Sequence, residues 1–386
     1  MVAVGLLNRD SAIMMAFSWP DQGDAFMDLF NPLHTVLNGN YSEAGHYTDV
    51  KSTYPPVIKG ILWLFGKILP QNIQLLGAKA IRSSTVGLLV AVISFMLCYF
   101  ILHTLFKQFV NKKSKLLPFF ALFCSPMIFL LDRGNTLFFV LVFSALFIAG
   151  YRSENPLIRH LSYVCLALAA AIKIYPAALG LLVLRERKIK DTVWCVAYGA
   201  AFCIVPFFII GIDELFLYVR NITSSFDRNT AGERYWLVDY THVLTNLGDW
   251  IFSSKTIGAS IARITLYPFT LLLAACAIVS KDRWKSVMAV MLIQILFPGF
   301  SVYYMISFLA IPLLMLIGSE DKRRIDYLYI SLFALALVPL QFLCGALGVL
   351  QEYVWQIAGF AGFAISIVLI VDCAAEFIKK YKIKES

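Results

Sequence analysis

The chain has 386 residues, of which 60% are hydrophobic and 15% are charged, and its mean hydropathy is +0.75. A soluble domain carries about 25% charged residues, so this composition excludes an ordinary soluble protein and indicates an α-helical protein that crosses a membrane several times. The net charge of +9 does not indicate a nucleic-acid partner, because the basic residues lie between the apolar runs and share no face. No CxxC motif or Cys/His ligand spacing occurs, which argues against a structural metal.

The N-terminal part of the chain is polar compared with the rest. Residues 1–19 contain Asn8-Arg9-Asp10 and give no complete span, so we expect a first transmembrane helix to be incomplete here. Residues 20–56 form a polar loop with four aspartates and a proline turn: Asp21, Asp24, Asp28, Asp49 and Tyr54-Pro55-Pro56. A carboxylate beside a bilayer needs water or a partner, so this cluster predicts a functional site.

Asp28 is the acid that we expect to take part in the chemistry. Asp24 and Asp28 are four residues apart and would share a face if residues 23–37 are helical. Two neighbouring carboxylates raise the pKa of one of them, which suits a general base. We therefore predict Asp28 as catalytic and Asp24 as the second candidate, and interpret Asp21 and Asp49 as solvated loop residues or helix caps.

Six short segments rich in lysine and arginine define the topology. By the positive-inside rule, the following segments lie in the cytoplasm: 107–115, 152–160, 185–191, 281–285, 318–324 and 379–384. The outer face then carries residues 20–56, Asp132-Arg133-Gly134-Asn135 and the polar segment 212–256. Residues 57–82 follow an outer loop and precede a span that must also start outside. We expect them to lie along the outer interface as amphipathic helices, with Lys59 snorkelling toward water.

The apolar runs predict an all-α polytopic membrane protein with a single domain over residues 1–386, a bundle of roughly 9–11 spanning or half-spanning helices. Its expected parts are the outer loop and interfacial helices 20–82, helices 83–211, an outer loop 212–256 and helices 257–386. Full or near-full spans are expected at 83–106, 116–131, 136–150, 192–211, 257–279, 326–345 and 354–375.

Two further runs are interrupted. The run 160–184 lies between basic segments but has about 25 residues, whereas two crossings need roughly 40. It contains Lys173-Ile174-Tyr175-Pro176, and the proline disfavours helix at the residue before it. We predict a broken hairpin whose tip, at Lys173–Pro176, lines a cavity open to the outer face. The run 286–317, interrupted at Pro298-Gly299 and near Tyr304, is either a tight helical hairpin or a second cavity-lining tip.

Lys173 and Arg133 are charges that need an explanation. A lysine in an apolar run costs several kcal/mol and usually marks a functional path; the alternative is a lysine that snorkels from a helix end. Arg133 lies at an outer helix junction, where the alternative is an interfacial pair with Asp132. If both cations reach one cavity, they form an anion site that suits a phosphate. The aromatic and basic residues of 212–256 suit a sugar or lipid headgroup, or an ordinary interfacial belt.

Four short motifs occur together in an order that matches a known family. They are Met27-Asp28-Leu29-Phe30-Asn31, Tyr54-Pro55-Pro56, Arg133-Gly134-Asn135 and Ala171-Ile172-Lys173-Ile174-Tyr175-Pro176. Their order and spacing resemble glycosyltransferase family 87 over roughly residues 20–310. That family belongs to the GT-C superfamily of membrane transferases and includes mannosyltransferases that depend on polyprenol-phosphate mannose.

The resemblance implies a GT-C-like fold and an inverting transfer of a mannose- or pentose-like sugar. The implied donor is a polyprenyl-phosphate sugar and the acceptor a glycan or glycolipid, at the outer face of the bilayer of a bacterial inner membrane. Asp28 would be the general base, and Lys173 and Arg133 would lie near the donor phosphate. The other substrate-binding residues would be Tyr54, Asn135, Tyr175 and Tyr304. No cofactor is implied, although some GT-C enzymes use a divalent cation.

Two other classes of protein share some of these features. A flippase or transporter for lipid-linked glycans also needs broken helices and buried cations, but has less need of an acid beside a phosphate site. A glycan polymerase relies on loop arginines and not on an aspartate in its first loop. The separating observation is geometric, because in a transferase Asp28 and Lys173 should face one cavity.

Overall fold

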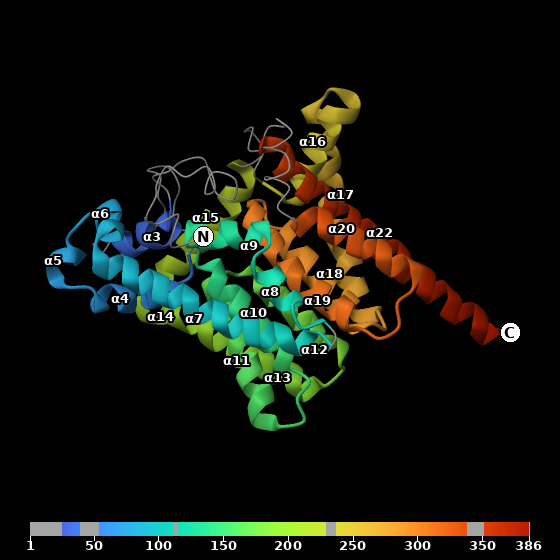
Figure 1. The fold of residues 1–386 in the computed structure, drawn as a ribbon, viewed down its shortest axis with the longest axis horizontal. Coiled ribbons are helices and arrows are strands. Elements are labelled where there is room, and N and C mark those ends of the chain that lie inside the picture. The colour runs from blue at the N-terminus through green and yellow to red at the C-terminus, as the bar shows by residue number, and fades with distance from the viewer. Residues whose placement is uncertain (1–24, 39–53, 112–113, 229–236, 338–350, 386) are drawn as a thin grey trace. The chain divides into compact units, whose positions relative to one another are not determined.

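The structure is a computed structural model, and it describes residues 25–38, 54–111, 114–228, 237–337 and 351–385 (Figure 1). Within these ranges the chain is helical, apart from short connections and an isolated bridge between Leu237 and Val302. This confirms the predicted all-α fold.

The helices include four that are long and apolar enough to cross a membrane, counted over the described residues. They are α7 (Thr85–Phe109), α13 with α14 (Ile189–Ile210), α17 (Lys255–Val279) and residues Trp355–Lys379 of α22 (Gln351–Glu385). Shorter apolar helices lie between them, and α7 exposes large apolar side chains such as Leu97 and Phe100. The prediction of a polytopic membrane protein is therefore confirmed, whereas the side on which each loop lies stays a prediction.

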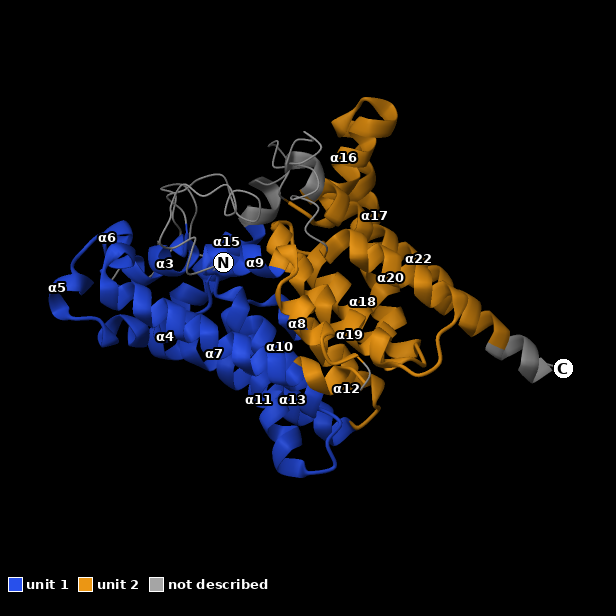
Figure 2. Cartoon of the chain, viewed as in Figure 1, with its two compact units in different colours: residues 1–105, 127–177, 189–225 blue, residues 106–126, 178–188, 226–386 orange. Residues whose placement is uncertain are grey.

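The chain divides into two compact units, coloured separately in Figure 2. Unit 1 consists of Met1–Leu105, Met127–Ala177 and Ile189–Ser225. Unit 2 consists of Phe106–Pro126, Ala178–Lys188 and Phe226–Ser386. The expectation of a single domain stays a prediction.

Unit 1 begins with a group of short helices: α3 (Met27–Leu37), α4 (Pro56–Ile68), α5 (Gln71–Gln74) and α6 (Ala78–Ser83). α3 packs against α4 and α6. α4 buries Ile58 and Leu62 and exposes Leu64 and Ile68, so both of its faces are apolar. The helices expected within 57–82 are thus present, and their place at the membrane interface stays a prediction.

The core of unit 1 is α10 (Leu137–Gly150), which packs against α11 (Pro156–Ile172); α11 in turn packs against α13 (Ile189–Cys203). α10 is apolar and mostly buried, and the buried alanines at 169–171 form the last turn of α11. The unit also contains most of α7, of α9 (Ser125–Arg133) and of α15 (Ile212–Arg228), together with α14 (Val205–Ile210). The predicted span 192–211 is divided at Ile204, because Pro206 lacks an N–H group and starts a new helix.

The helix break that the sequence predicted at Lys173–Pro176 is present, whereas the hairpin arrangement and the cavity-lining tip stay predictions. α11 ends at Ile172, and Lys173 is extended, with φ −144° and ψ 132°. A short 3₁₀ helix, η3 (Tyr175–Leu179), follows and leads into α12 (Gly180–Arg185). Pro176 explains the interruption, because the residue before a proline is disfavoured in helical conformation.

One expected span is divided, and helices occupy parts of two segments that were expected as loops. The span 116–131 is two helices, α8 (Leu117–Leu122) and α9 (Ser125–Arg133), and a proline near the start of α9 accounts for the new helix. The outer loop 212–256 contains α15 and α16 (Tyr240–Phe252). α15 is helical although its composition is polar, because its apolar residues recur at helical spacing and form one face. α3 begins at Met27 and not at residue 23.

Unit 2 contains α8, α12, α16, α17, α18 (Arg283–Leu296), η5 (Tyr303–Leu309), α19 (Ala310–Gly318), α20 (Arg324–Leu337) and α22. Every residue of α18 from Trp284 to Leu296 is buried, which makes it the centre of the unit. The predicted interruption of 286–317 lies between α18 and η5, where Val238 N–H donates to Ser301 O at 2.7 Å.

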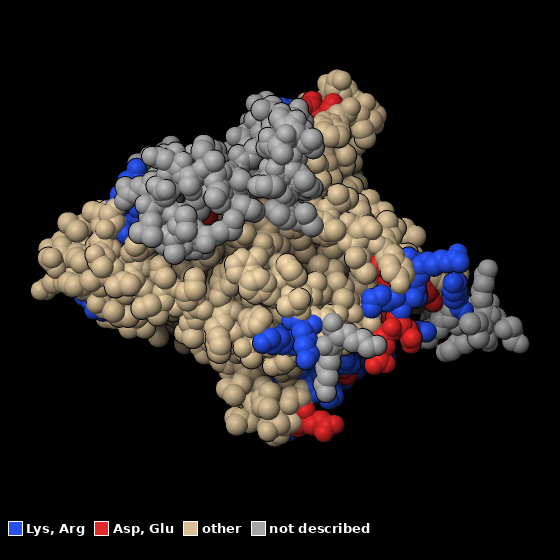
Figure 3. Space-filling view, viewed as in Figure 1, with Lys and Arg blue, Asp and Glu red and all other residues tan. Residues whose placement is uncertain are grey.

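A network of charges joins α18, α20 and α22 at one end of unit 2. Lys285 is fully buried, and its Nζ lies 2.7 Å from Asp372 and also pairs with Glu376. Arg323 Nη2 lies 3.0 Å from both Asp372 and Asp326. In Figure 3, charged side chains gather at this end beside α22, whereas the helix surfaces nearby are largely uncharged. Such a division suits helices that are embedded in lipid with their ends in water.

Candidate active site

The loop before α10 lies against the start of α3, and this close approach determines the candidate site. Gly134 has a φ of +61°, in the left-handed region that glycine adopts without strain. A Cβ atom at Gly134 would lie 2.8 Å from the Cα atom of Phe26, so this position also needs the smallest residue. Phe26, with φ 59°, donates its backbone N–H to the carbonyl of Asp132 at 2.7 Å. The glycine of the Arg-Gly-Asn motif therefore allows α3 to begin against the motif's own backbone.

The ring of Phe26 anchors this contact in the core of unit 1. It is 2% exposed and lies 5.7 Å, between ring centroids, from Phe95 of α7. Phe95 lies edge to face against Phe138 of α10 at 5.7 Å. Because aromatic pairs of this geometry add to the stability gained from burial, the start of α3 is fixed relative to α7 and α10.

Asp28, in the first turn of α3, is held by both side chains that flank Gly134. Arg133 Nη2 lies 2.5 Å from Asp28 Oδ1, and Asn135 Nδ2 donates to Oδ2 at 2.7 Å. Asn135 is 4% exposed, and its Oδ1 accepts the N–H of Leu137 at 2.9 Å. A carboxylate has about four lone-pair sites, so these contacts orient Asp28 and still leave it able to accept a proton.

Lys173 contributes a second cation to the same cluster. Its Nζ lies 4.1 Å from the centroid of the Tyr54 ring, which is a cation–π contact. The Asp28 carboxylate acts electrostatically on both Lys173 and Tyr54. The structure thus brings Asp28, Arg133, Asn135, Tyr54 and Lys173 together in unit 1 from four separate segments, although their roles stay predictions.

The phenol of Tyr54 is held protonated. Burial raises the pKa of Tyr54 above its usual value of 10.0, and the negative charge of Asp28 raises it further, while Arg133 opposes the shift. A protonated phenol can donate a hydrogen bond to an oxygen of a ligand and also presents its ring to Lys173.

The other predicted residues fall in three different places. Tyr175 begins η3, two residues after Lys173, and is close enough to Tyr54 for the two phenols to interact electrostatically. Tyr304 lies in η5 of unit 2 and is half-buried. Asp24 lies outside the described residues, so its role as the second catalytic candidate stays a prediction.

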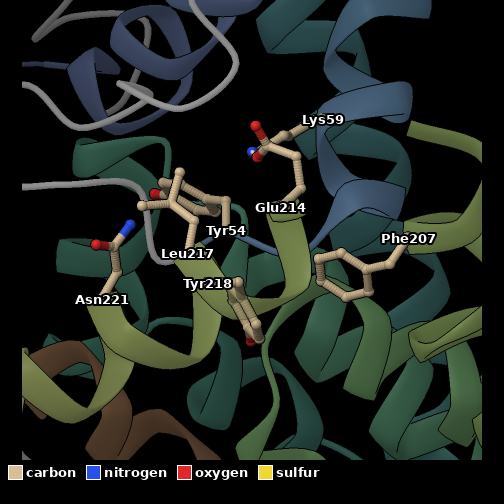
Figure 4. A pocket seen from close by; sticks show the side chains of 7 residues that line it. All are labelled: Tyr54, Lys59, Phe207, Glu214, Leu217, Tyr218 and Asn221. Carbon is tan, nitrogen blue, oxygen red and sulfur yellow. Dashed lines mark ion pairs between the residues drawn. The ribbon is translucent and has the colours of Figure 1, made fainter. Parts of the chain in front are cut away.

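The sequence did not predict a second polar contact beside this cluster. Lys59 of α4 is only 7% exposed, and its Nζ lies 3.7 Å from Oε2 of Glu214 on α15 (Figure 4). Burial lowers the pKa of Lys59, while Glu214 acts to raise it. The expectation that Lys59 snorkels to water is therefore wrong. The sequence signal for this contact was Glu214, an acid in the first turn of the strongly amphipathic helix α15. Nothing in the sequence indicated that its partner is Lys59.

Taken together, the fold and the cluster define an all-α integral membrane protein with a carboxylate and two cations grouped in unit 1. The family model of glycosyltransferase family 87 matches residues 53–312. The chain belongs to this family and is a membrane glycosyltransferase. The matched range includes Tyr54, Arg133, Asn135, Lys173 and the hairpin, and it begins after Asp28. Neither a curated protein nor a solved structure gives a significant match.

Proposed function

We propose that this glycosyltransferase moves a mannose- or pentose-like sugar from a polyprenyl-phosphate donor to a glycan or lipid acceptor, with inversion, at the outer face of a bacterial inner membrane. The observation that carries the proposal is the grouping of Asp28, Arg133 and Lys173 in unit 1 of a family 87 member. A transfer from a sugar phosphate needs a base for the attacking hydroxyl and positive charge for the departing phosphate.

Asp28 is the proposed base. The acceptor hydroxyl gives its proton to the carboxylate while its oxygen forms a bond to the anomeric carbon of the donor. The bond between that carbon and the phosphate oxygen breaks, and polyprenyl phosphate leaves with the bonding electrons. A single displacement of this kind inverts the anomeric configuration. Arg133 and Asn135 keep the carboxylate oriented in the resting enzyme, which reduces the reorganisation needed at the moment of reaction.

Arg133 and Lys173 are the proposed phosphate ligands. A guanidinium has five N–H donors in a planar fork, so Arg133 can contact Asp28 and a phosphate oxygen together. Lys173 supplies a point charge from the break in the hairpin, where its side chain is half-buried. Because these cations balance the phosphate charge, no metal cofactor is part of the proposal, and chelation by EDTA should leave transfer unchanged.

The test is a transfer assay with synthetic polyprenyl-phosphate hexoses and pentoses, with source-cell membranes as acceptor. Asp28→Asn keeps the size of the side chain and removes the base, so transfer should fall by about 10²–10⁴-fold while the donor still binds. Asp249→Asn is the matched control, because Asp249 is 44% exposed in unit 2 and should have no effect. Transfer that survives Asp28→Asn would remove Asp28 as the base.

Lys173→Ala tests the phosphate role separately. Loss of the ammonium should weaken donor binding by about 10-fold or more, the typical effect of a lost charge-assisted hydrogen bond. A variant that keeps its donor affinity would show that Lys173 does not contact the phosphate. If labelled donor crosses the membrane intact and no product forms with any donor, the protein moves lipid-linked sugars and does not transfer them.

A further inference from the structure

Two cysteines of unit 2 contact each other through their thiols, and the mechanism above does not use them. Seven cysteines fall within the described residues, and all are free. Cys276 of α17 and Cys373 of α22 form a hydrogen bond between their side chains. The two helices pack against each other, so the contact belongs to a helix interface inside the unit.

Both thiols are enclosed by the protein, since each of the two cysteines is 5% exposed. A single buried cysteine behaves as a small apolar residue and is usually inert. A pair of thiols in contact differs, because a disulfide requires its two sulfur atoms to approach to about 2 Å. Here the packing of α17 on α22 already holds the thiols next to each other, so bond formation needs only a short further approach.

The charge network at the end of unit 2 gives this pair a reactive environment. The ammonium of Lys285 acts electrostatically on both thiols. Its Nζ lies 2.7 Å from the carboxylate of Asp372, the residue that precedes Cys373. A cation beside a thiol stabilises the thiolate, which is the form that reacts. Glu376 opposes this effect at Cys373, so Cys276 is better placed to act as the thiolate.

The burial of the pair limits the oxidant that can reach it. A peroxide is little larger than a water molecule, whereas a peptide disulfide is too large for thiols that are this enclosed. α17 ends at Val279, shortly after Cys276, and charged side chains gather beside α22 at this end (Figure 3). On the predicted topology this end lies in the cytoplasm, where thiols are kept reduced. The resting pair is therefore a dithiol that waits for an oxidant.

We propose that Cys276 and Cys373 are a site of reversible oxidation, at which a peroxide converts the two thiols into a disulfide between α17 and α22. The Cys276 thiolate attacks one oxygen of hydrogen peroxide, the O–O bond breaks and hydroxide leaves, which gives a sulfenic acid. The Cys373 sulfur then attacks the sulfur of Cys276, and water leaves as the S–S bond forms. The two thiol protons end in the two water molecules. Both sulfurs are oxidised and one peroxide is reduced.

The bond would join two helices that are distant in the sequence. It closes a loop of about 100 residues, and a cross-link over a loop of that length stabilises the fold by restricting the unfolded chain. Oxidation should therefore raise the thermal midpoint of the protein. The inference does not depend on the proposed function, because neither the sugar donor nor Asp28 takes part in it.

The first test locates the bond in purified, detergent-solubilised protein treated with hydrogen peroxide. After the remaining thiols are alkylated under denaturing conditions, mass spectrometry of the digested protein should find the peptides of Cys276 and Cys373 joined. The protein should stay monomeric on a non-reducing gel, and dithiothreitol should separate the peptides again. Cys98→Ser is the matched control, because Cys98 is also 5% exposed but lies on α7 in unit 1, and this variant should form the bond as wild type does.

The second test measures the thermal midpoint and leaves the charge network intact. Peroxide should raise the midpoint of wild type and of Cys98→Ser, and dithiothreitol should reverse the rise. Cys276→Ser and Cys373→Ser should show no such rise, because neither variant can form the bond.

The third test concerns Lys285. Lys285→Met removes the ammonium beside the thiols and should slow formation of the bond about 10-fold or more. Lys255→Met, which removes an exposed lysine at the other end of α17, should leave the rate unchanged. Rates are measured on protein that elutes as a folded monomer.

Three outcomes would overturn the assignment. If peroxide joins no Cys276 peptide to a Cys373 peptide in folded wild type, the pair is not a site of oxidation. If the same peptides join equally fast in protein unfolded before treatment, the fold does not prepare the pair. If Lys285→Met forms the bond at the wild-type rate, the ammonium does not activate Cys276.

Discussion

Gly134→Ala tests whether the geometry of the candidate site requires a glycine between Arg133 and Asn135. An alanine at this position must keep a φ of +61°, which costs an L-residue roughly 1–2 kcal/mol. Its Cβ atom would lie 2.8 Å from Phe26 Cα, closer than such atoms approach. The backbone of Phe26 is held by its bond to Asp132 and by its buried ring, so it cannot move away at little cost. Overpacking of this kind costs about 1–3 kcal/mol.

The two costs together predict a loss of about 2–5 kcal/mol in the free energy of unfolding. Any relaxation must move α3 away from the loop, which displaces Asp28 relative to Arg133 and Asn135. A displacement of about 1 Å in a catalytic group can lower the rate about 10²-fold. Gly134→Ala is therefore expected to lower both the thermal midpoint and the transfer rate of the folded fraction.

The assay compares the variant with Gly60→Ala in purified detergent-solubilised protein. A Cβ atom at Gly60 would meet nothing within 4 Å, and Gly60 lies within a helix, so that alanine should be neutral or stabilise by up to about 1 kcal/mol. Folded protein is measured by size-exclusion chromatography after heating, and transfer is normalised to it. Equal midpoints and equal rates for the two variants would refute the reasoning. A lower midpoint with a normal rate would show that Gly134 does not position Asp28.

Three further predictions concern other contacts of the described residues. Asn135→Leu removes the amide donor to Asp28 and should lower transfer about 10- to 100-fold, so an unchanged rate would show that Asp28 needs no such support. Tyr54→Leu removes a cation–π contact worth about 0.5–2 kcal/mol and should raise donor KM, whereas Tyr54→Phe keeps the ring and should not. Because the pKa of Tyr54 is raised above its usual value of 10.0, its phenol stays protonated in the working range. The alkaline limb of the pH–rate profile should therefore be the same for Tyr54→Phe and wild type. A shift of that limb would mean that the phenol ionises. Lys285→Met removes one of the two cations that pair with the buried Asp372, while Arg323 remains. It should lower stability by about 1.5–3 kcal/mol, the usual contribution of a hydrogen bond to a charged group, as seen in the thermal midpoint, whereas Lys255→Met, whose pair is half-exposed at 4.0 Å, should change it little.

The helix break at Lys173–Pro176 shows how far local sequence information reaches. Its position followed from two properties of the chain itself, the length of an apolar run between basic segments and the backbone restriction that Pro176 imposes. The same reasoning placed most of the long apolar helices within a few residues. It was less accurate where tertiary contacts decide a boundary, as at α3, which begins at Met27 because Phe26 is held in a left-handed conformation against Gly134.

The sequence by itself determined that this is an all-α membrane protein of glycosyltransferase family 87, and it singled out Asp28, Arg133 and Lys173 as charges that need a function. These conclusions depend on composition, periodicity and short motifs, which are local properties. Only the tertiary structure decided that Arg133 and Asn135 both contact Asp28, from more than 100 residues away, and that Lys59 is buried against Glu214. Such pairs are fixed by helix packing, and no spacing along the chain encodes which distant side chain a buried charge will meet.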